Sequence, residues 1–424
     1  MSFNKSNENV DRNIIIIGSG MAGLYFAYKI KKKYKNSSFL ILEKNKKKFI
    51  GGRANNDYFY GSKIVTGAGI GRKNKDKLLY KLLCDFGFDI NEFNVNPNYS
   101  QSLQKEKVDI NKIMNVLRNE YKNNYDIYNK EKLSFKQFSV KVLGEDIYKK
   151  FILSSGYTDY ENEDVLETLY HYGMEDNTCC FTGFRVDWIE LISRMYTFIE
   201  GDKNIKFSNN VTNIQRIDKN RFLVESNNGF IYSCSNVILA TTIDSVKTLL
   251  PIQNSINKNT NLIYNQIKGQ PFLRLYAKVS KKSIPIMKEY IKGYTIVKSV
   301  LQKIIPMDPD NGIYMIAYND NKNTIKLKNY LENTKNNKEF YERLLEKTLN
   351  TPSNSISIIS LKPYYWDIGT HYYKPFVGGI KKDFIYKAQH PENGIFVIGE
   401  MVSINQGWVE GALESVENIF KRDF

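Results

Sequence analysis

The sequence is poor in the residues that bind structural metals or form disulfides. Its 424 residues include only 4 cysteines and 3 histidines. The cysteines, Cys84, Cys179, Cys180 and Cys234, show no metal-ligand spacing. We therefore expect neither a metal site nor a disulfide framework, and a reducing compartment is favoured.

Long hydrophobic runs are also absent. No segment reaches the roughly 20 apolar residues that a membrane-spanning helix needs. The first 12 residues are polar and an apolar run begins soon after them, so we expect neither a signal peptide nor a membrane anchor. With 42% hydrophobic residues, 30 tyrosines and 24 phenylalanines, the chain can bury a large core. We expect a soluble, cytoplasmic protein of two or three domains.

Acidic residues are fewer than basic ones, so the chain carries a net positive charge. A net charge of +16 would suit a nucleic-acid partner. However, the lysines are scattered over the whole length, together with abundant Asn, Ile and Tyr, as an AT-rich genome would impose. We predict no specific nucleic-acid partner, and the sequence leaves the oligomeric state open.

A glycine-rich turn carries the first functional signal. The β-branched run Ile14–Ile17 predicts a strand buried on both faces, and Leu24–Ile30 predicts a helix. Between them lie Gly18, Gly20 and Gly23, in the G-x-G-x-x-G pattern. In this context the glycines allow a tight turn, close approach of a pyrophosphate, and close packing of helix on strand.

A second apolar run, residues 39–42, ends in Glu43, which lies 20 residues after Gly23. A carboxylate at this distance accepts hydrogen bonds from a ribose. An ordinary strand–helix–strand unit with a solvated glutamate is the alternative, and we favour the dinucleotide site. The predicted contacts include the rest of the turn and the next residue, namely Ser19, Met21, Ala22 and Lys44.

The remaining pattern predicts an α/β fold with a Rossmann-like domain of parallel sheet, helices and a small β-meander. We assign residues 1–87, 181–260 and 384–424 to this discontinuous dinucleotide-binding domain. Residues 88–180, mainly helical, and 261–383, mixed β/α, would form an inserted α+β substrate domain. Expected helices span 77–86, 108–121, 132–143, 161–170, 186–199 and 338–349; expected strands span 205–207, 211–217, 222–226, 230–234, 236–242, 272–279, 313–318, 356–361 and 394–400, with 65–72 irregular.

Four separated motifs give the chain a resemblance to a known family. They are Gly18–Gly23 with Glu43; Gly51-Gly52-Arg53; Gly67-Ala68-Gly69-Ile70; and Gly399-Glu400 with Gly407–Ala412. In this order they resemble those of the flavin-containing amine oxidases, which include monoamine, polyamine and L-amino-acid oxidases and the related protoporphyrinogen oxidases.

The resemblance implies a bound FAD. Arg53 would face its pyrophosphate, Glu400 its ribityl chain, and the backbone of Val211 its adenine. Val409, at the start of the last helix, would present its N–H to the flavin N1/O2 edge. The resemblance implies further contacts from Gly52, Gly69, Ile70, Gly399 and Trp408. Because no cysteine follows Cys234, we expect the FAD to be bound non-covalently.

The resemblance also implies the walls of a substrate site. Trp408 stands where the family places an aromatic wall, and Tyr365, with its neighbours Tyr364 and Trp366, would form the opposite wall. Arg274 falls near the position of a lysine that many amine oxidases place near flavin N5. Arg72 is a candidate for binding a substrate carboxylate.

The expected activity is oxidation of an amine or amino acid. A hydride would pass from the substrate C–N carbon to flavin N5, giving an imine, and O2 would reoxidise the flavin to yield H2O2. Two alternatives stay open. One is a protoporphyrinogen-oxidase-like or desaturase-like flavoprotein, and the other is a flavin-bound scaffold without catalysis.

Overall fold

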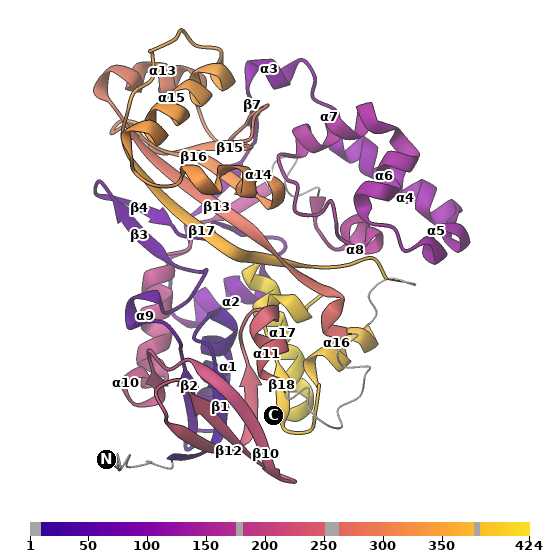
Figure 1. Ribbon diagram of the computed structural model, residues 1–424, viewed down its shortest axis with the longest axis vertical. Helices are drawn as coiled ribbons and strands as arrows, with labels where there is room; N and C mark the ends of the chain where they lie inside the picture. The colour runs from indigo at the N-terminus through magenta and orange to yellow at the C-terminus, as the bar shows by residue number, and fades with distance from the viewer. Residues whose placement is uncertain (1–9, 175–180, 251–262, 377–381) are drawn as a thin grey trace, which may run out of the picture.

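The strand predicted from the four isoleucines lies at the centre of a largely parallel sheet. The structure is a computed structural model that describes residues 10–174, 181–250, 263–376 and 382–424 (Figure 1). β1 (Val10–Ile17) pairs in parallel with β2 (Phe39–Leu42) and β12 (Ile231–Leu239). Ile14 and Ile16 pack into one core and Ile15 and Ile17 into another, so the strand is buried on both faces as expected.

The rest of this sheet comes from distant parts of the chain. Its order is β10-β11-β12-β1-β2-β9, with β18 beside β12. The expected strands 230–234 and 236–242 are one continuous strand, β12, because the chain does not turn between them. The further strands are β9 (Ile205–Lys206), β10 (Val211–Asp218), β11 (Arg221–Ser226) and β18 (Ile395–Val397). β10, β11 and β12 pair antiparallel and form the meander.

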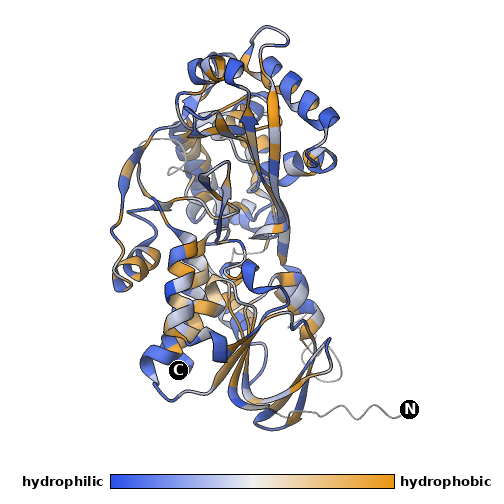
Figure 2. Ribbon diagram, turned by 90° about the vertical axis from the view of Figure 1, so that its left-hand side faces the viewer, coloured by the Kyte–Doolittle hydropathy of each residue, from blue (hydrophilic) through white to orange (hydrophobic). Residues whose placement is uncertain are grey.

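The first and last helices of this half lie side by side. α1 (Met21–Lys33) contacts α17 (Val409–Asp423), and both pack into the core that Ile14 and Ile16 enter. In Figure 2, α17 carries both hydrophobic and hydrophilic residues up to the C-terminus, as expected of a helix with one buried face. The other helices here are α2 (Lys77–Asp85), α9 (Trp188–Phe198), α10 (Gly201–Asn204), α11 (Ile243–Leu249) and α16 (Lys382–Gln389).

A second sheet forms the upper half, in the order β17-β13-β16-β15-β14-β7. Two of its strands, β13 (Ile267–Val279) and β17 (Ile358–Tyr373), are long and run back to the first half (Figure 1). The sequence predicted a strand over 356–361 only; pairing with β13 extends it through the aromatic run after Pro363. The others are β7 (Asn98–Tyr99), β14 (Thr295–Ile296), β15 (Lys303–Asp308) and β16 (Ile313–Asp320).

Helices cover one face of this second sheet. α13 (Ile284–Tyr290), α14 (Asn321–Leu327) and α15 (Lys335–Leu349) pack with the side chains of Leu273 and Leu275 in a core of their own. The opposite face carries Phe272, Arg274 and Tyr276. Arg274 and Tyr276 donate hydrogen bonds to Gly67 and Val65, so this face looks toward the first half.

A helical lobe with a separate core lies beside the second sheet. The expected helix 161–170 begins only at Val165, because the carboxylate of Asp164 caps it by accepting from the N–H groups of Leu166 and Glu167. Similarly, the helix expected from residue 132 begins at Phe135, after a capping box made by Ser134. The helices are α3 (Gln101–Gln104), α4 (Ile110–Asn123), α5 (Tyr125–Glu131), α6 (Phe135–Leu143), α7 (Glu145–Ser155) and α8 (Val165–Tyr170).

Short elements join the two halves. The segment expected to be irregular, 65–72, contains the two-residue strand β5 (Gly71–Arg72), which pairs with β8 (Phe181–Phe184). β6 (Glu92–Val95) pairs with the other edge of β8, and β3 (Asn56–Phe59) pairs with β4 (Ser62–Val65). Single 3₁₀ turns are η1 (Lys47–Phe49), η3 (Lys281–Ser283), η4 (Lys328–Tyr330) and η5 (Glu400–Val402).

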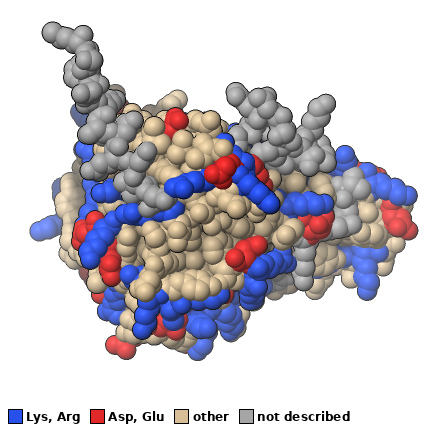
Figure 3. Space-filling model, turned by 90° about the horizontal axis from the view of Figure 1, so that it is seen from below, with Lys and Arg blue, Asp and Glu red and all other residues tan. Residues whose placement is uncertain are grey.

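Two surface properties bear on partners. Among the helices in the described part of the chain, none has the length and apolar composition required to cross a membrane. On the face seen in Figure 3, basic side chains lie in several groups with acidic ones among them. The domain boundaries drawn at 180/181 and 260/261 touch the undescribed segments, as do Cys179 and Cys180, and the division into domains stays a prediction.

Candidate functional site

The turn between β1 and α1 leaves room for a ligand at its tip. Gly18 has a φ of 108°, and a Cβ there would lie 2.5 Å from the carbonyl oxygen of Ala240. A Cβ on Gly23 would lie 2.1 Å from the carbonyl oxygen of Gly18. By contrast, no described atom lies within 4 Å of the Cβ position of Gly20, which is the N-cap of α1 and offers no side-chain cap. The helix N–H groups therefore face open space, which suits a phosphate. The other turn residues, Ser19, Met21 and Ala22, are buried.

Glu43 lies beside this turn. Its Oε2 accepts hydrogen bonds from the backbone N–H and the hydroxyl of Ser19, both at 2.8 Å. Its Oε1 accepts from the backbone N–H of Asn45 at 2.9 Å. The carboxylate is thus fixed next to the start of α1, and its contact with a ribose stays a prediction. Lys44, the next residue, is exposed.

An ion pair joins the two ends of the chain at this place. Arg53 Nη1 donates to the carbonyl oxygen of Gly369 at 2.8 Å and to Oε1 of Glu400 at 3.0 Å. The turn before Arg53 packs on the glycine turn, since a Cβ on Gly52 would lie 3.8 Å from the Cα of Gly20. The side chain of Arg53 keeps 31% of its surface accessible. Its remaining donors can therefore meet an anionic ligand above Gly20.

Glu400, in η5, is held by three donors. Besides Arg53 it accepts from Nδ1 of His371 at 2.5 Å and from the backbone N–H of Gly407 at 3.1 Å. His371 Nε2 accepts from the N–H of Ile243, which assigns the imidazole proton to Nδ1. Burial raises the pKa of Glu400, but His371, Arg53 and the Gly407 N–H outweigh it and lower the pKa to about 2. The contact of His371 could not be predicted from the sequence, because only the register of β17 brings this side chain to Glu400.

A second uncapped helix start faces the same region. Val409 is the first residue of α17, and its N-cap, Trp408, makes no side-chain cap. Trp408 meets Trp188 edge to face with ring centroids 6.4 Å apart, and Trp188 Nε1 donates to the carbonyl oxygen of Gly69. The indole N–H of Trp408 is buried and has no partner among the described residues. Gly69 and Gly399 resemble Gly20, since no described atom lies within 4 Å of their Cβ positions.

Arg274 lies on β13 against the turn at residues 66–70. Its Nε and Nη2 donate to the carbonyl oxygen of Gly67 at 3.2 and 2.9 Å. Its guanidinium carbon lies 3.3 Å from the ring centroid of Tyr318 and 4.1 Å from that of Phe272. The residue is only 3% exposed, and burial lowers its pKa. Arg274 is therefore a buried cation close to the predicted flavin position.

Tyr365, predicted for the substrate wall, lies on the helix-covered face of the second sheet, opposite to Arg274. In the register of β13 and β17, Tyr365 pairs with Leu273, and it packs into the core on the helix-covered face of the sheet. Side chains alternate along a strand, so its neighbour Trp366 is on the face of Arg274. Trp366 Nε1 donates to the carbonyl oxygen of Thr66 at 2.8 Å. Tyr364, which pairs with Arg274 and donates to Asp57, is on the same face, and Trp366 is the one that contacts the 66–70 turn.

Three other residues predicted to bind cofactor or substrate make only ordinary contacts within the protein. Arg72 donates from Nη2 and Nε to the buried carboxylate of Asp76, at 2.9 and 3.3 Å, so its charge is already compensated. Val211 is buried at the start of β10. Ile70 is half-buried and approaches Gly183 of β8. Their contacts with cofactor or substrate stay predictions.

Lys303 was missed by the sequence analysis. This first residue of β15 is 0% exposed, and its ammonium lies over the rings of Tyr157 and Tyr318, 4.1 Å from the centroid of the latter. No described residue accepts a hydrogen bond from its Nζ. A lysine in a polar-looking segment such as Gln302-Lys303 is normally solvated, so only the fold reveals it. The described residues hold no group of His, Cys, Asp and Glu suited to a metal.

Three comparisons place this geometry among known proteins. Residues 16–84 match the family model of an NAD(P)-binding Rossmann-like domain. Across 98% of its length the chain superimposes on 100% of a putrescine oxidase double mutant with a TM-score of 0.74, at 13% sequence identity. The chain has the fold of putrescine oxidase. Wild-type putrescine oxidase bound to putrescine gives a TM-score of 0.73 at the same identity and coverage.

One known protein resembles this chain in sequence over nearly its whole length. An uncharacterized protein of Acanthamoeba polyphaga mimivirus is 20% identical over 503 residues, which cover 99% of this chain and 96% of that protein. The fold match to putrescine oxidase extends over 98% of the chain, so it includes both sheets.

Proposed function

We propose that the protein is an FAD-dependent oxidase of an amine or amino acid. One observation carries this proposal. Two uncapped helix starts, at Gly20 and at Trp408, face open glycine positions, and the Arg53–Glu400 ion pair connects them. A nicotinamide site needs only the first of these helix starts. A cofactor with a pyrophosphate at one end and an electron-rich ring at the other suits both.

The residues present fit FAD. The start of α1 and Arg53 would hold the pyrophosphate, Glu43 the ribose and Glu400 the ribityl chain. The start of α17 would place its positive end at the ring, where negative charge is stabilised. The unpartnered indole N–H of Trp408 is a buried donor that a ligand at this place could satisfy. We expect non-covalent binding, because no cysteine follows Cys234.

When bound, FAD would accept a hydride from the C–N carbon of the substrate, and O2 would then take the electrons to give H2O2. The chain's own residues orient and desolvate the substrate. Trp408 and Trp366 provide aromatic surfaces, and the buried sheet face excludes water. The likeness in fold to putrescine oxidase supports a small amine-bearing substrate.

The test begins with the purified protein. We expect a flavin absorption spectrum that survives gel filtration but is lost on acid precipitation, as for non-covalent FAD. A panel of monoamines, diamines and amino acids should then reveal peroxide release with at least one compound. A protein that stays colourless after refolding with FAD would refute the proposal. A yellow protein that releases no peroxide with any compound would favour the scaffold without catalysis.

A further inference from the structure

Two basic side chains, Arg274 and Lys303, are buried on one face of the second sheet, beside the ring of Tyr318. Arg274 and Lys303 both contact the ring of Tyr318, with the guanidinium carbon at 3.3 Å and the ammonium at 4.1 Å from its centroid. They are 3% and 0% exposed. Nη1 of Arg274 and Nζ of Lys303 have no hydrogen-bond partner among the described residues. A buried charge without a partner is strongly unfavourable, so the guanidinium of Arg274 calls for an anion at Nη1.

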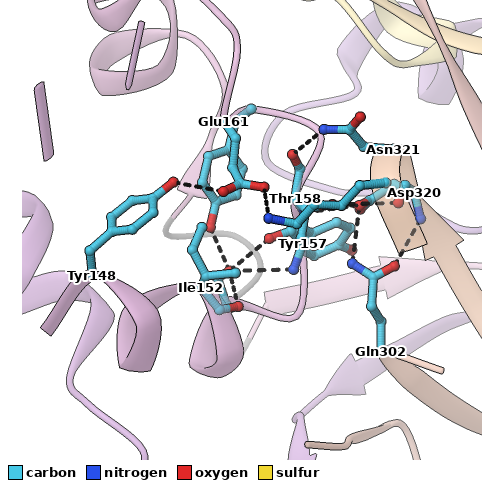
Figure 4. A network of polar contacts seen from close by, with 11 residues as sticks. Tyr148, Ile152, Tyr157, Thr158, Glu161, Gln302, Asp320 and Asn321 are labelled. Carbon is cyan, nitrogen blue, oxygen red and sulfur yellow. Dashed lines mark hydrogen bonds and ion pairs between the residues drawn. The ribbon is translucent and has the colours of Figure 1, made fainter. Parts of the chain in front are cut away.

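The nearby acids do not supply that anion. Asp320 accepts through Oδ1 from the N–H and hydroxyl of Thr158 and from the amide of Gln302, and these bonds tie the helical lobe to the sheet (Figure 4). No ion pair within 4 Å joins Asp320 to either basic side chain within the described chain. Burial lowers the pKa of Lys303 well below its usual value; the charges of Asp320 and Asp159 oppose this shift, and that of Arg274 adds to it.

The second acid is Asp159. It accepts from the hydroxyl of Tyr172 at 2.6 Å. Burial and the charge of Asp320 raise its pKa to about 7. It therefore carries only part of a negative charge at neutral pH. Neither acid contacts the guanidinium of Arg274, whose hydrogen bonds both go to the neutral carbonyl of Gly67.

Tyrosines surround this place and keep some accessible surface. Tyr157, Tyr172 and Tyr294 are half-buried, yet burial raises the pKa of each hydroxyl strongly. Tyr157, which follows α7 of the helical lobe, lies over the ammonium of Lys303 on the sheet face of Arg274.

We infer that Arg274, supported by Lys303, binds the carboxylate of the substrate, so that the substrate is an amino acid and not a simple amine or a diamine. This inference rests on the proposed oxidase function. Arg274 contacts the 66–70 turn, where the flavin would lie, so a carboxylate at Nη1 would hold the adjacent C–N bond near the cofactor. A diamine would instead bring a second ammonium group toward two buried basic side chains.

Three probes of similar size and different charge test the inference in the flavin-loaded protein. They are phenylacetate, phenylacetamide and phenethylamine, and binding is followed by calorimetry and by the change in the flavin spectrum. We expect phenylacetate to bind at least about tenfold more tightly than the other two. This is the size expected from one hydrogen bond to a charged group. Equal or tighter binding of phenethylamine or putrescine would overturn the inference.

Variants then assign the site. Arg274→Gln should weaken phenylacetate binding by about 10- to 100-fold and leave phenylacetamide unchanged. Lys303→Met should weaken it less, because Lys303 acts at longer range. Lys278→Met is the matched control, since Lys278 lies on the same strand but bonds to Asn311, and phenylacetate binding should not change. If Arg274→Gln fails to fold, the comparison of the three probes in the wild-type protein still decides whether the site prefers a carboxylate.

The outcomes separate this inference from the proposed function. A flavin-loaded protein that binds phenylacetate no better than phenylacetamide refutes the carboxylate site and leaves the oxidase proposal standing. A protein that cannot be loaded with flavin refutes the oxidase proposal. In that case calorimetry with phenylacetate still tests the carboxylate site, and a failure to bind refutes it as well.

Discussion

Replacing Glu400 by glutamine tests the ion pair that connects the two ends of the chain. The unfolded carboxyl has a pKa of 4.5, and in the folded chain the pKa is lowered to about 2. At about 1.4 kcal/mol per unit, this difference corresponds to about 3 kcal/mol of folding free energy at pH 7. We expect Glu400→Gln to lose an amount of this order, because the amide keeps the shape but not the charge.

The pH dependence gives the sharper form of the prediction. A group whose pKa is lowered by folding stabilises the protein fully above its unfolded pKa. That contribution is lost as the pH falls toward the folded pKa. The difference in unfolding free energy between wild type and variant should therefore be constant above about pH 5. It should shrink by more than half by pH 3, which lies inside the window between 4.5 and about 2.

The assay is urea unfolding at pH 7, 5 and 3, without added flavin, so that cofactor affinity does not enter the comparison. Glu414→Gln is the control, because the Glu414 carboxylate accepts from the hydroxyl of Ser403 and the amide of Asn405. Its loss should be smaller at pH 7. A Glu400→Gln deficit that stays the same at pH 3 as at pH 7 would refute the reasoning. It would mean that packing, and not charge, holds Glu400 in place.

Three further predictions concern other parts of the site. Gly23→Ala should lower stability by about 1–3 kcal/mol and weaken FAD binding, because its Cβ would lie 2.1 Å from the Gly18 carbonyl oxygen; denaturation and fluorescence titration measure both, and Gly69→Ala, with open space around it, should keep its stability. Trp408→Leu should lower kcat/KM about tenfold while FAD stays bound, whereas Trp408→Phe should retain most of it, as steady-state peroxide release would show. Since the pKa of Asp159 is raised to about 7, wild type loses stability as the pH rises from about 4 to 7, and Asp159→Asn should show a higher Tm than wild type at pH 8 but not at pH 4.

The sequence was informative where function depends on local backbone. A turn such as Gly18–Gly23 needs its glycines for contacts within a few residues or with one neighbouring strand, so the pattern appears directly in the chain. The same is true of β1, whose four isoleucines are buried on both faces. Helix positions were right but their starts were not, because caps such as Asp164 decide the first residue.

The residues that face the substrate were harder to predict from the sequence than the glycine turn. Whether Tyr365 or Trp366 faces the site depends on the register of β17 against β13, and a shift of one residue reverses the face. Nothing in the run Pro363–Gly369 specifies that register, since its residues are aromatic on both faces. The choice among Tyr364, Tyr365 and Trp366 therefore depends on register and not on residue type.

Lys303, like Tyr365, could not be placed from the sequence, because its position depends on how strands and helices pack. Arg274 could be found because the family resemblance singles it out, near the position of a lysine that many amine oxidases place near flavin N5. Lys303 follows Gln302 in a chain with 61 lysines and arginines, so its position in the sequence does not distinguish it. Its burial results from the contact of β15, β16 and the helical lobe around Tyr318. A single buried arginine could be retained for its bonds to Gly67 alone. A second unpartnered basic side chain on the same ring has no such local purpose, and a negatively charged substrate group beside it would favour its charged form.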